Sequence, residues 1–469
     1  MPKETQFRKS MRWLYPGMQV KRWLLLAILG VILISIGVSL ILYTPYFRSI
    51  YVTWNRFVFH VVKDYWTAVA FGLLWLIGGV SLIVIGLQKM NRSVIDGVVP
   101  ALESDVASII FKKRQLEKGP NILAVGGGHG LHTLLHGIKK FTSNTTAVVT
   151  VFDDGGSSGR LRKDLGILPP GDIRNCLIAL ADTEPLMRQL FQHRFDNENE
   201  LKGHNFGNLF ITALTQVTGD FQKAIVESSK VLAVKGRVLP TTLQNVTLQA
   251  ECEDGTLVSG ESNIGHCFKK IKNLFLEPTP VLTTPDVLRA IQEADLIVLG
   301  PGSLFTSVLC NLAVQEVRDA IVKSRAPLIY VLNVTTQPGE TDHFSPADHL
   351  DALFRFIPQE RLNHVLINNQ EPSPEEVSAL RERGVEPICM GNLNVASSTR
   401  VITAPLLASE QPTRHDSEKL ARAIMHILLE EKPAWGFFFA LYTEERFKRI
   451  SLLDLVSGIK ERRKTSRLR

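Results

Sequence analysis

The stretch Asn121–Leu131 has the sequence NILAVGGGHGL and decides the fold class. Its first half is a short apolar run typical of a buried strand, and its second half is a glycine-rich turn that opens a helix. A helical pattern over Leu131–Lys140 leads to a second apolar run at Ala147–Phe152. Strands that alternate with helices in this way predict parallel βαβ units. We therefore expect an α/β domain with a Rossmann-like, doubly wound, mostly parallel sheet over residues 119–430.

Further short apolar runs and helical patterns continue through the same region. Strands are expected at Leu296–Leu299, Leu328–Leu332 and His364–Ile367, and a β-hairpin at Asn245–Gly260 that turns at residues 253–255. Helices are expected at Ile173–Ala181, at Pro185–His193, from Asn208 into the 220s, and at Ser417–Glu430. The extra helices between the first strands predict a side layer on one domain.

The charge of the 469-residue chain is distributed unevenly along the sequence. The formal net charge is +7 and the isoelectric point is about 9.1, values that favour a nucleic-acid partner when the charge lies on one face. Here residues 1–22 carry +5 and residues 444–469 carry another +5, which leaves about −3 for the chain between them. The basic balance therefore indicates a membrane surface, and we expect no nucleic acid as partner.

Two uncharged runs near the N-terminus are long enough to cross a lipid bilayer. Trp23–Tyr43 has 21 residues and Tyr65–Leu87 has 23, while a helix needs about 20 to cross a ~30 Å hydrocarbon core. The first run exceeds the roughly 7–15 apolar residues of a cleaved signal peptide. The sequence predicts a two-helix transmembrane hairpin over residues 23–87, with buried core helices as the alternative.

Basic residues gather on the side of both ends of this hairpin. Six precede the first run and six lie between residues 89 and 118, whereas the connecting loop has three. The positive-inside rule then places the α/β domain in the cytoplasm of a two-pass cell-membrane protein. Residues 88–118 would form a juxtamembrane linker. Residues 431–469 form an aromatic and then basic tail, which either lies on the bilayer or stays solvated. The five cysteines form no CxxC pair, in agreement with a reducing compartment.

The first candidate site is the glycine-rich turn after the first expected strand. It comprises Gly126, Gly127, Gly128, His129 and Gly130. Glycines let backbone N–H groups approach a phosphate, and the following helix N-terminus adds positive potential. Leu131 stands where the dinucleotide fingerprint GxGxxG has its last glycine, which disfavours a nicotinamide-type site. A tight turn without a ligand is the alternative.

The second candidate site follows the second expected strand and has the sequence DDGGSSGRLR. In an open parallel sheet the carboxyl ends of neighbouring strands form one crevice, so this loop should face the first. Asp153 and Asp154 could hold a divalent cation such as Mg²⁺ or accept sugar hydroxyls. Donors to a ligand are expected from Gly155, Gly156, Ser157, Ser158 and Arg160. A flexible acidic surface turn is the alternative.

Two turns before helices supply further polar candidates. These are Arg174 and Asn175 after PPGD, and Asn205 and Asn208 in GHNFGN. Asp172, within PPGD, is explained by capping of the following helix. For the other four, ligand contact and a tight connection remain alternatives.

The last candidates follow two later strands at their carboxyl ends. GPGSLFTS opens a helix and contributes Gly302, Ser303, Phe305 and Thr306, and the next strand is followed by Asn333 and Gln337. Several glycine-containing strand-to-helix turns in one sheet suggest a ligand with a diphosphate and a polar remainder.

Other catalytic patterns are missing from the sequence. There is no GxxxxGK[ST] and no CxxC pair, and His132 and His136 lack the HExxH context of a zinc site. The sequence therefore predicts neither an acyl nucleophile nor a zinc centre.

Taken together, the loops resemble those of the YvcK/CofD superfamily. The matching runs are Ile122–Leu131, Ala147–Arg162, Pro169–Asn175, Asp182–Phe195, Gly203–Asn208, Gly300–Ser307 and Gly339–Leu350. The resemblance covers about residues 120–430, and the pair DDGGSSGRLR and PPGDIRN is very specific. It is nearest to the YvcK-like, UDP-sugar-binding gluconeogenesis-factor branch, and it extends to the enzyme 2-phospho-L-lactate transferase.

The resemblance implies a Rossmann-like fold and a ligand of the nucleotide-diphosphate type. For the YvcK-like branch it implies a UDP-sugar ligand and a role in gluconeogenic growth, cell-wall synthesis and cell shape, with wall-synthesis proteins or a second copy as partners. The transferase branch implies instead an enzyme, with Asp153 and Asp154 in catalytic roles. Two residues depart from the branch: Phe305 stands where Tyr is frequent, and His129 stands where Thr is usual.

Overall fold

The computed structural model describes residues 20–41, 65–98, 113–196, 200–388, 391, 393, 395–409, 411 and 413–436. The chain divides into two compact units, residues 1–112 and residues 113–469. The predicted connecting loop of the hairpin, most of the basic N-terminus, part of the linker and nearly all of the tail lie outside the described residues.

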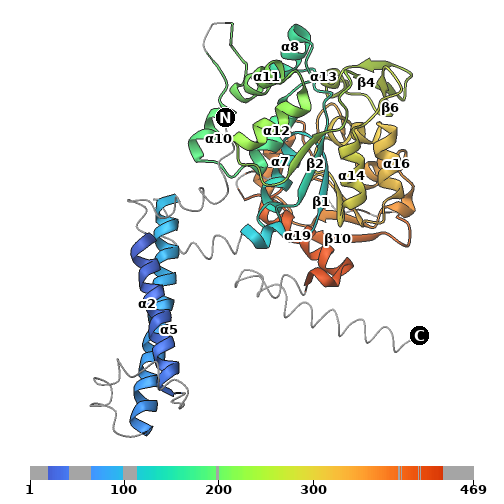
Figure 1. Cartoon of the computed structure of the whole chain (residues 1–469). Coiled ribbons are helices and arrows are strands. Elements are labelled where there is room, and N and C mark those ends of the chain that lie inside the picture. The colour runs from blue at the N-terminus through green and yellow to red at the C-terminus, as the bar shows by residue number, and fades with distance from the viewer. Residues whose placement is uncertain are drawn as a thin grey trace, which may run out of the picture. The chain divides into compact units, whose positions relative to one another are not determined.

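The first unit contains two long antiparallel helices, α2 (Val20–Ile41) and α5 (Tyr65–Val98), which pack side by side (Figure 1). A Cβ added to Gly30 would lie 2.7 Å from the carbonyl oxygen of Gly79, and one added to Gly37 would lie 2.7 Å from that of Gly72. Only glycine allows backbones to come this close. The two predicted helices are therefore present, and α5 continues eleven residues beyond the predicted end.

The outer surface of this helix pair is apolar. Exposed large side chains include Leu25, Ile28, Val31, Trp66, Leu74 and Ile77. Among the described residues, one helical stretch, Val69–Met90, is long and apolar enough to cross a membrane, and the apolar part of α2, Arg22–Val38, is shorter. Crossing of a membrane by both helices therefore stays a prediction.

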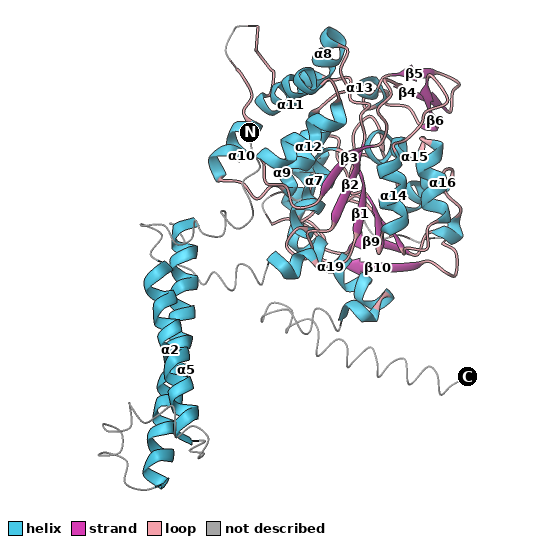
Figure 2. Ribbon diagram, in the orientation of Figure 1, coloured by secondary structure: helices cyan, strands magenta, loops and turns pink. Residues whose placement is uncertain are grey.

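The second unit is built on a seven-stranded sheet in which every pairing is parallel (Figure 2). The strands are β1 (Ile122–Gly126), β2 (Thr145–Val149), β3 (Arg237–Pro240), β7 (Leu296–Leu299), β8 (Leu328–Val331), β9 (His364–Asn368) and β10 (Arg400–Ala404). Their order across the sheet is β10-β9-β8-β7-β1-β2-β3. The central strands are buried along their whole length, as expected for a parallel sheet covered on both faces.

Helices cover both faces of this sheet. One layer contains α7 (Gly128–Ile138), α9 (Gly171–Leu180), α12 (Phe221–Val231) and α19 (Ser417–Glu431), and the other contains α14 (Pro285–Glu293) and α16 (Gln315–Lys323) (Figure 2). Further helices are α8 (Gly156–Leu165), α10 (Pro185–Gln192), α11 (Phe206–Thr218), α17 (Pro346–Phe354) and α18 (Pro374–Arg381). The doubly wound fold predicted from the sequence is confirmed.

The strand order places the topological switch point between β1 and β7. These two strands are neighbours, yet β1 leads into α7 in one layer while β7 leads through a short helix, α15 (Cys310–Leu312), to α16 in the other. The connections therefore diverge at the carboxyl ends of β1 and β7. Ligands of open α/β sheets bind in the crevice outside such a point.

A smaller antiparallel sheet is inserted after β3. It consists of β4 (Thr247–Cys252), β5 (Leu257–Ser259) and β6 (Ile271–Glu277) in the order β5-β4-β6, with the short helix α13 (Glu261–Ile264) between β5 and β6. The predicted hairpin is confirmed, since Glu251 pairs with Leu257 across the turn. The third strand, β6, was not predicted.

The structure corrects several element boundaries. The second strand, predicted at Ala147–Phe152, runs from Thr145 to Val149, and β3 and β10 were not predicted. Gly219, with a φ of +68°, ends α11 and divides the helix predicted from Asn208 into the 220s. The loop DDGGSSGRLR contains a helix, α8, from its second glycine onward.

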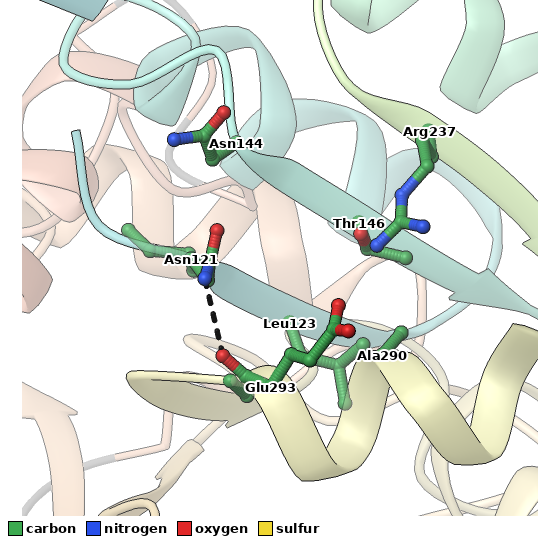
Figure 3. Close-up of a pocket in the computed structure, with 9 residues that line it drawn as sticks. Asn121, Leu123, Asn144, Thr146, Arg237, Ala290 and Glu293 are labelled. Carbon is green, nitrogen blue, oxygen red and sulfur yellow. Dashed lines mark hydrogen bonds between the residues drawn. The ribbon is translucent and has the colours of Figure 1, made fainter. Parts of the chain in front are cut away.

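A small pocket lies at the amino ends of β1 and β2 (Figure 3). It is lined by residues including Asn121, Thr146, Arg237 and Glu293, and the Asn121 side-chain amide donates to the carbonyl oxygen of Glu293 at 3.2 Å. This contact holds the loop between α14 and β7 against the start of β1. The polar residues that line the pocket therefore have a structural role.

Candidate functional site

The turn after β1 opens the N-terminus of α7 at the carboxyl edge of the sheet. Gly127 is the N-cap residue, and Gly128 has a φ of +61°, a left-handed conformation that favours glycine. Among the described residues, the backbone N–H groups of His129 and Gly130 have no acceptor. Unpaired N–H groups at a helix N-terminus attract anions. The first candidate loop therefore has the geometry of an anion site.

This turn is in direct contact with the turn after β7. A Cβ added to Gly130 would collide with the carbonyl oxygen of Pro301 and lie 2.8 Å from the Cα atom of Gly302. Gly302 is fixed from the other side by Asn333, whose side-chain amide donates to the Gly302 carbonyl at 2.9 Å and accepts the Gly302 N–H at 3.3 Å. Asn333 thus holds the β7 turn against the β1 turn.

The turn after β2 opens a second helix N-terminus, that of α8. Gly155 is its N-cap residue, and the N–H groups of Gly156, Ser157 and Ser158 have no acceptor within the described part of the chain. Asp153 accepts the Gly155 N–H at 2.9 Å. Because β1 and β2 are neighbours in parallel register, the open N-termini of α7 and α8 lie at the same edge of the sheet.

Asp172 supports the first turn, which differs from its predicted role as a cap. Pro170 is the N-cap of α9, and the Asp172 carboxylate accepts the N–H of Gly128. A Cβ on Gly127 would collide with the same carboxylate. Burial, and next the Asp153 carboxylate, raise the pKa of Asp172 to about 7. Asp172 contacts Gly128 and does not cap its own helix, because it lies on the face of α9 that packs toward α7.

Arg174 lies in a hydrogen-bonded network beneath the two helix N-termini. Its guanidinium donates to Asn208 Oδ1 at 2.9 Å and to Asn175 Oδ1 at 2.8 Å. The Asn208 amide donates in turn to Ser157 Oγ at 3.2 Å, and Ser157 Oγ lies 3.2 Å from His204 Nδ1. The structure thus brings the α9 and α11 candidates into contact with the second loop.

The turn after β7 is closed to anions by a carboxylate of the protein itself. Glu340, which follows β8, accepts the N–H groups of Phe305 at 2.5 Å and Thr306 at 3.1 Å, and lies 3.3 Å from Thr306 Oγ1. Burial raises the pKa of Glu340. This N-terminus was predicted to receive a ligand phosphate, but in this conformation Glu340 occupies it.

Phe305 and Gln337, two other candidates in this region, make contacts within the domain. The Phe305 ring is 2% exposed and packs edge-to-face on Phe344 at a centroid distance of 6.2 Å, so it is not placed to stack on a base. Gln337 makes backbone bonds within the turn that carries Glu340. Ser303 is the N-cap of the π-helix η3 (Leu304–Leu309), which follows β7, and it makes no capping hydrogen bond with its side chain.

Arg160 and Asn205 are placed at the rim of the second loop. Arg160 is exposed and donates to the Lys202 carbonyl at 2.8 Å. Asn205 is the N-cap of α11, where it accepts the Asn208 N–H and donates to the Gln192 carbonyl at 3.0 Å. The hydrogen bonds of Asn205 are those of a structural cap, whereas Arg160 keeps its charge at the surface.

Glu261 is a site residue that the sequence did not indicate. It begins α13 in the inserted sheet, next to Ser262, whose N–H donates to Asp154 at 2.9 Å. Burial, and next the charges of Asp153 and Asp172, raise the pKa of Glu261 to about 8. Burial likewise raises the pKa of Asp153. The α13 segment therefore adds a carboxyl group close to Asp153, Asp154 and Asp172.

The acidic groups do not form a complete metal site. Asp153 and Asp154 direct oxygens to different loops, Asp153 to Gly155 and Asp154 to Ser262. No three His, Cys, Asp or Glu side chains among the described residues are placed to hold a metal ion. A cation here would have one or two carboxylate ligands, and phosphates and water would supply the rest, an arrangement typical of Mg²⁺.

Fold and site together define a parallel α/β protein with two glycine-rich helix N-termini at its switch point, an arrangement typical of nucleotide-binding domains. The model of the CofD family, described as 2-phospho-L-lactate transferase CofD, matches residues 122–407. The chain therefore belongs to the CofD/YvcK family, as the resemblance of its loops predicted.

Some relatives match only the α/β domain, and others match nearly the whole chain. The gluconeogenesis factor of Bacillus subtilis is 45% identical and matches 66% of this chain and 99% of its own length. A solved structure from Bacillus halodurans has a TM-score of 0.62, is 44% identical and covers 66% of this chain and all of its own. A relative from Clostridium acetobutylicum is 38% identical over 97% of this chain and 98% of its own. Its match therefore extends into the helix pair.

Proposed function

We propose that the α/β domain binds a nucleotide sugar of the UDP-sugar type and regulates carbon flux into cell-wall synthesis and cell shape. The observation that carries this proposal is the pair of open helix N-termini, α7 and α8, at one edge of the sheet. Two adjacent anion sites suit the two phosphates of a diphosphate. The name of the Bacillus subtilis relative, gluconeogenesis factor, supports a role in carbon flux.

The charge of the crevice supports a cation as part of the ligand. A diphosphate bound at α7 and α8 would lie near Asp153 and Asp154, and Asp172 lies beneath the same turn. A divalent cation such as Mg²⁺, held by Asp153 or Asp154, would offset the repulsion between these carboxylates and the phosphates. Arg174, close to Asp153 and Asp172, and the exposed Arg160 supply positive charge in the same region.

The helix pair supports a membrane location for the same protein. Its glycines lie in the seam and its large apolar side chains lie outside, as in helices packed within lipid. In this proposal the chain is a two-pass membrane protein with the α/β domain in the cytoplasm. Wall-synthesis proteins, or a second copy of the chain, would then be the partners of the domain.

The binding proposal is tested with the full chain in lipid nanodiscs, titrated with UDP-N-acetylglucosamine and Mg²⁺ by calorimetry. His129→Glu places a carboxylate in the first turn of α7, where it repels phosphate while it favours the helix. We expect this variant to lose at least about tenfold in affinity, whereas His129→Gln stays near wild type. The absence of both heat and a thermal shift for the wild type would overturn the proposal.

The alternative is a transferase that moves a phosphorylated group from a nucleotide-diphosphate donor. The description of the family model favours it, and such chemistry needs little beyond positioning and charge stabilisation. Mg²⁺-dependent consumption of the nucleotide in the presence of candidate acceptors, lost in Asp154→Asn while binding is retained, would establish turnover. Binding without consumption leaves the regulatory role.

A further inference from the structure

One end of the helix pair brings two cations onto a single tryptophan ring. The guanidinium carbon of Arg22 lies 4.8 Å from the centroid of the Trp23 ring, and the ammonium nitrogen of Lys89 lies 5.8 Å from it. Arg22 and Trp23 belong to α2, and Lys89 belongs to α5. Both cations are exposed, while the indole is half-buried. The two helices thus contribute jointly to one basic, aromatic group.

The packing of the helices produces this convergence. A Cβ added to Gly86 would lie 2.9 Å from the Trp23 carbonyl oxygen and 3.1 Å from the Ala27 nitrogen, so α2 rests directly on α5 at this point. Lys89 follows Gly86 by three residues and lies nearly one turn further along the same side of α5. Close contact between the two helix backbones at Gly86 therefore places Lys89 beside Trp23.

The neighbouring sequence is rich in basic residues. Lys21 and Arg92 flank the group in the sequence, and the acidic residues before and after its two helices are Glu4, Asp64 and Asp96. The adjoining surface is apolar, since Leu24, Leu25 and Leu87 are exposed. Positive charge at the border of an apolar helix surface matches the headgroup level of a membrane.

We propose that Arg22 and Lys89, with Trp23 between them, bind the phosphate of an anionic phospholipid. This inference rests on the membrane placement within the proposed function. The two cations pair with the lipid phosphate, and the indole lies beside the glycerol region with its apolar part toward the acyl chains. A free phosphate in water would meet the same cations without the apolar neighbours, so a lipid is the favoured source.

The test uses the full chain reconstituted in phosphatidylcholine vesicles with spin-labelled lipids. Electron paramagnetic resonance gives the preference of the protein-bound lipid for phosphatidylglycerol over phosphatidylcholine. We expect the wild type to prefer phosphatidylglycerol and Arg22→Gln/Lys89→Gln to lose that preference, at most about fivefold for each cation. The matched double variant Arg48→Gln/Lys63→Gln removes two cations from between the predicted spans and should keep the preference.

Each outcome decides a different point. A chain that alkaline carbonate strips from the vesicles would overturn the membrane placement itself. An inserted chain without preference for phosphatidylglycerol, or an equal loss in both double variants, would overturn the headgroup site alone. Excess inorganic phosphate, compared with chloride at equal ionic strength, should leave the preference unchanged. If phosphate abolishes it, the group binds a soluble anion and the lipid assignment is wrong.

Discussion

In the helix pair, glycines lie inside and large apolar side chains lie outside, whereas the α/β domain has the reverse arrangement. Gly30 and Gly79 meet in the seam of the pair, and Leu74 is 67% exposed. In the domain, Leu135 and its neighbours are fully buried against the sheet. Burial of apolar area stabilises the domain, but it contributes little to a pair that leaves its large side chains uncovered. The difference shows that the two helices meet through close backbone packing while their large side chains remain uncovered.

The largest expected effect comes from one substitution made in both regions. Leu135→Ala removes a fully buried side chain from the domain and should lower the free energy of unfolding by about 2–5 kcal/mol. Leu74→Ala removes an exposed side chain of α5 and should leave the unfolding of the domain unchanged. Denaturant titration of the full chain in detergent, followed by near-ultraviolet circular dichroism, measures both. Equal losses would contradict the contrast between the regions.

A smaller effect tests the seam of the helix pair through two neighbouring glycines. A Cβ on Gly79 would lie 2.6 Å from the Gly30 carbonyl oxygen, whereas a Cβ on Gly78 meets nothing within 4 Å. Gly79→Leu should therefore separate the helices at a cost of about 1–3 kcal/mol, and Gly78→Leu should not. Distances between spin labels on α2 and α5 in lipid measure the separation. An unchanged distance in Gly79→Leu would show that close packing is not what holds the pair together.

The sequence predicted the elements of the domain that follow local patterns. The strands around β1, β7, β8 and β9 and the helix after the first glycine-rich turn lie where apolar runs and glycines placed them. It missed β3 because its sequence, RVLP, begins with an arginine and ends with a proline, whereas the equally short β7 is wholly apolar. It missed α8 because a helix that begins with Gly156, Ser157 and Ser158 has the composition of a loop.

The functional groups that were missed depend on contacts between distant residues. Glu340 reaches a helix N-terminus 34 residues away in sequence, and Ser262 meets Asp154 across 108 residues. No local pattern indicates that a carboxylate of the chain will occupy a site that looks open to phosphate. The candidate loops could therefore be located from the sequence, but which of them remain open could not.

The smallest expected effect is a change of stability with pH, which should arise in the α/β domain and not in the apolar stretches of the helix pair. Tyr65–Leu87 and Trp23–Ile41 contain no charged residue, whereas burial and then Asp153 raise the pKa of Asp172 in the domain to about 7. Because this value is above that of the unfolded chain, the contribution of Asp172 favours folding below about pH 4 and is lost as the pH rises through 7.

Asp172→Asn removes this titration while its amide oxygen can still accept the Gly128 N–H. The variant domain should be more stable than the wild type by about 1–2 kcal/mol at pH 8, and the difference should shrink or reverse at pH 5. Urea midpoints at the two pH values measure it, and the helicity of the helix pair should not change between them. If the variant is less stable at pH 8, the ionised carboxylate stabilises the glycine-rich turn more than its burial costs. The ionised Asp172 would then stabilise the glycine-rich turn after β1 even before a ligand binds.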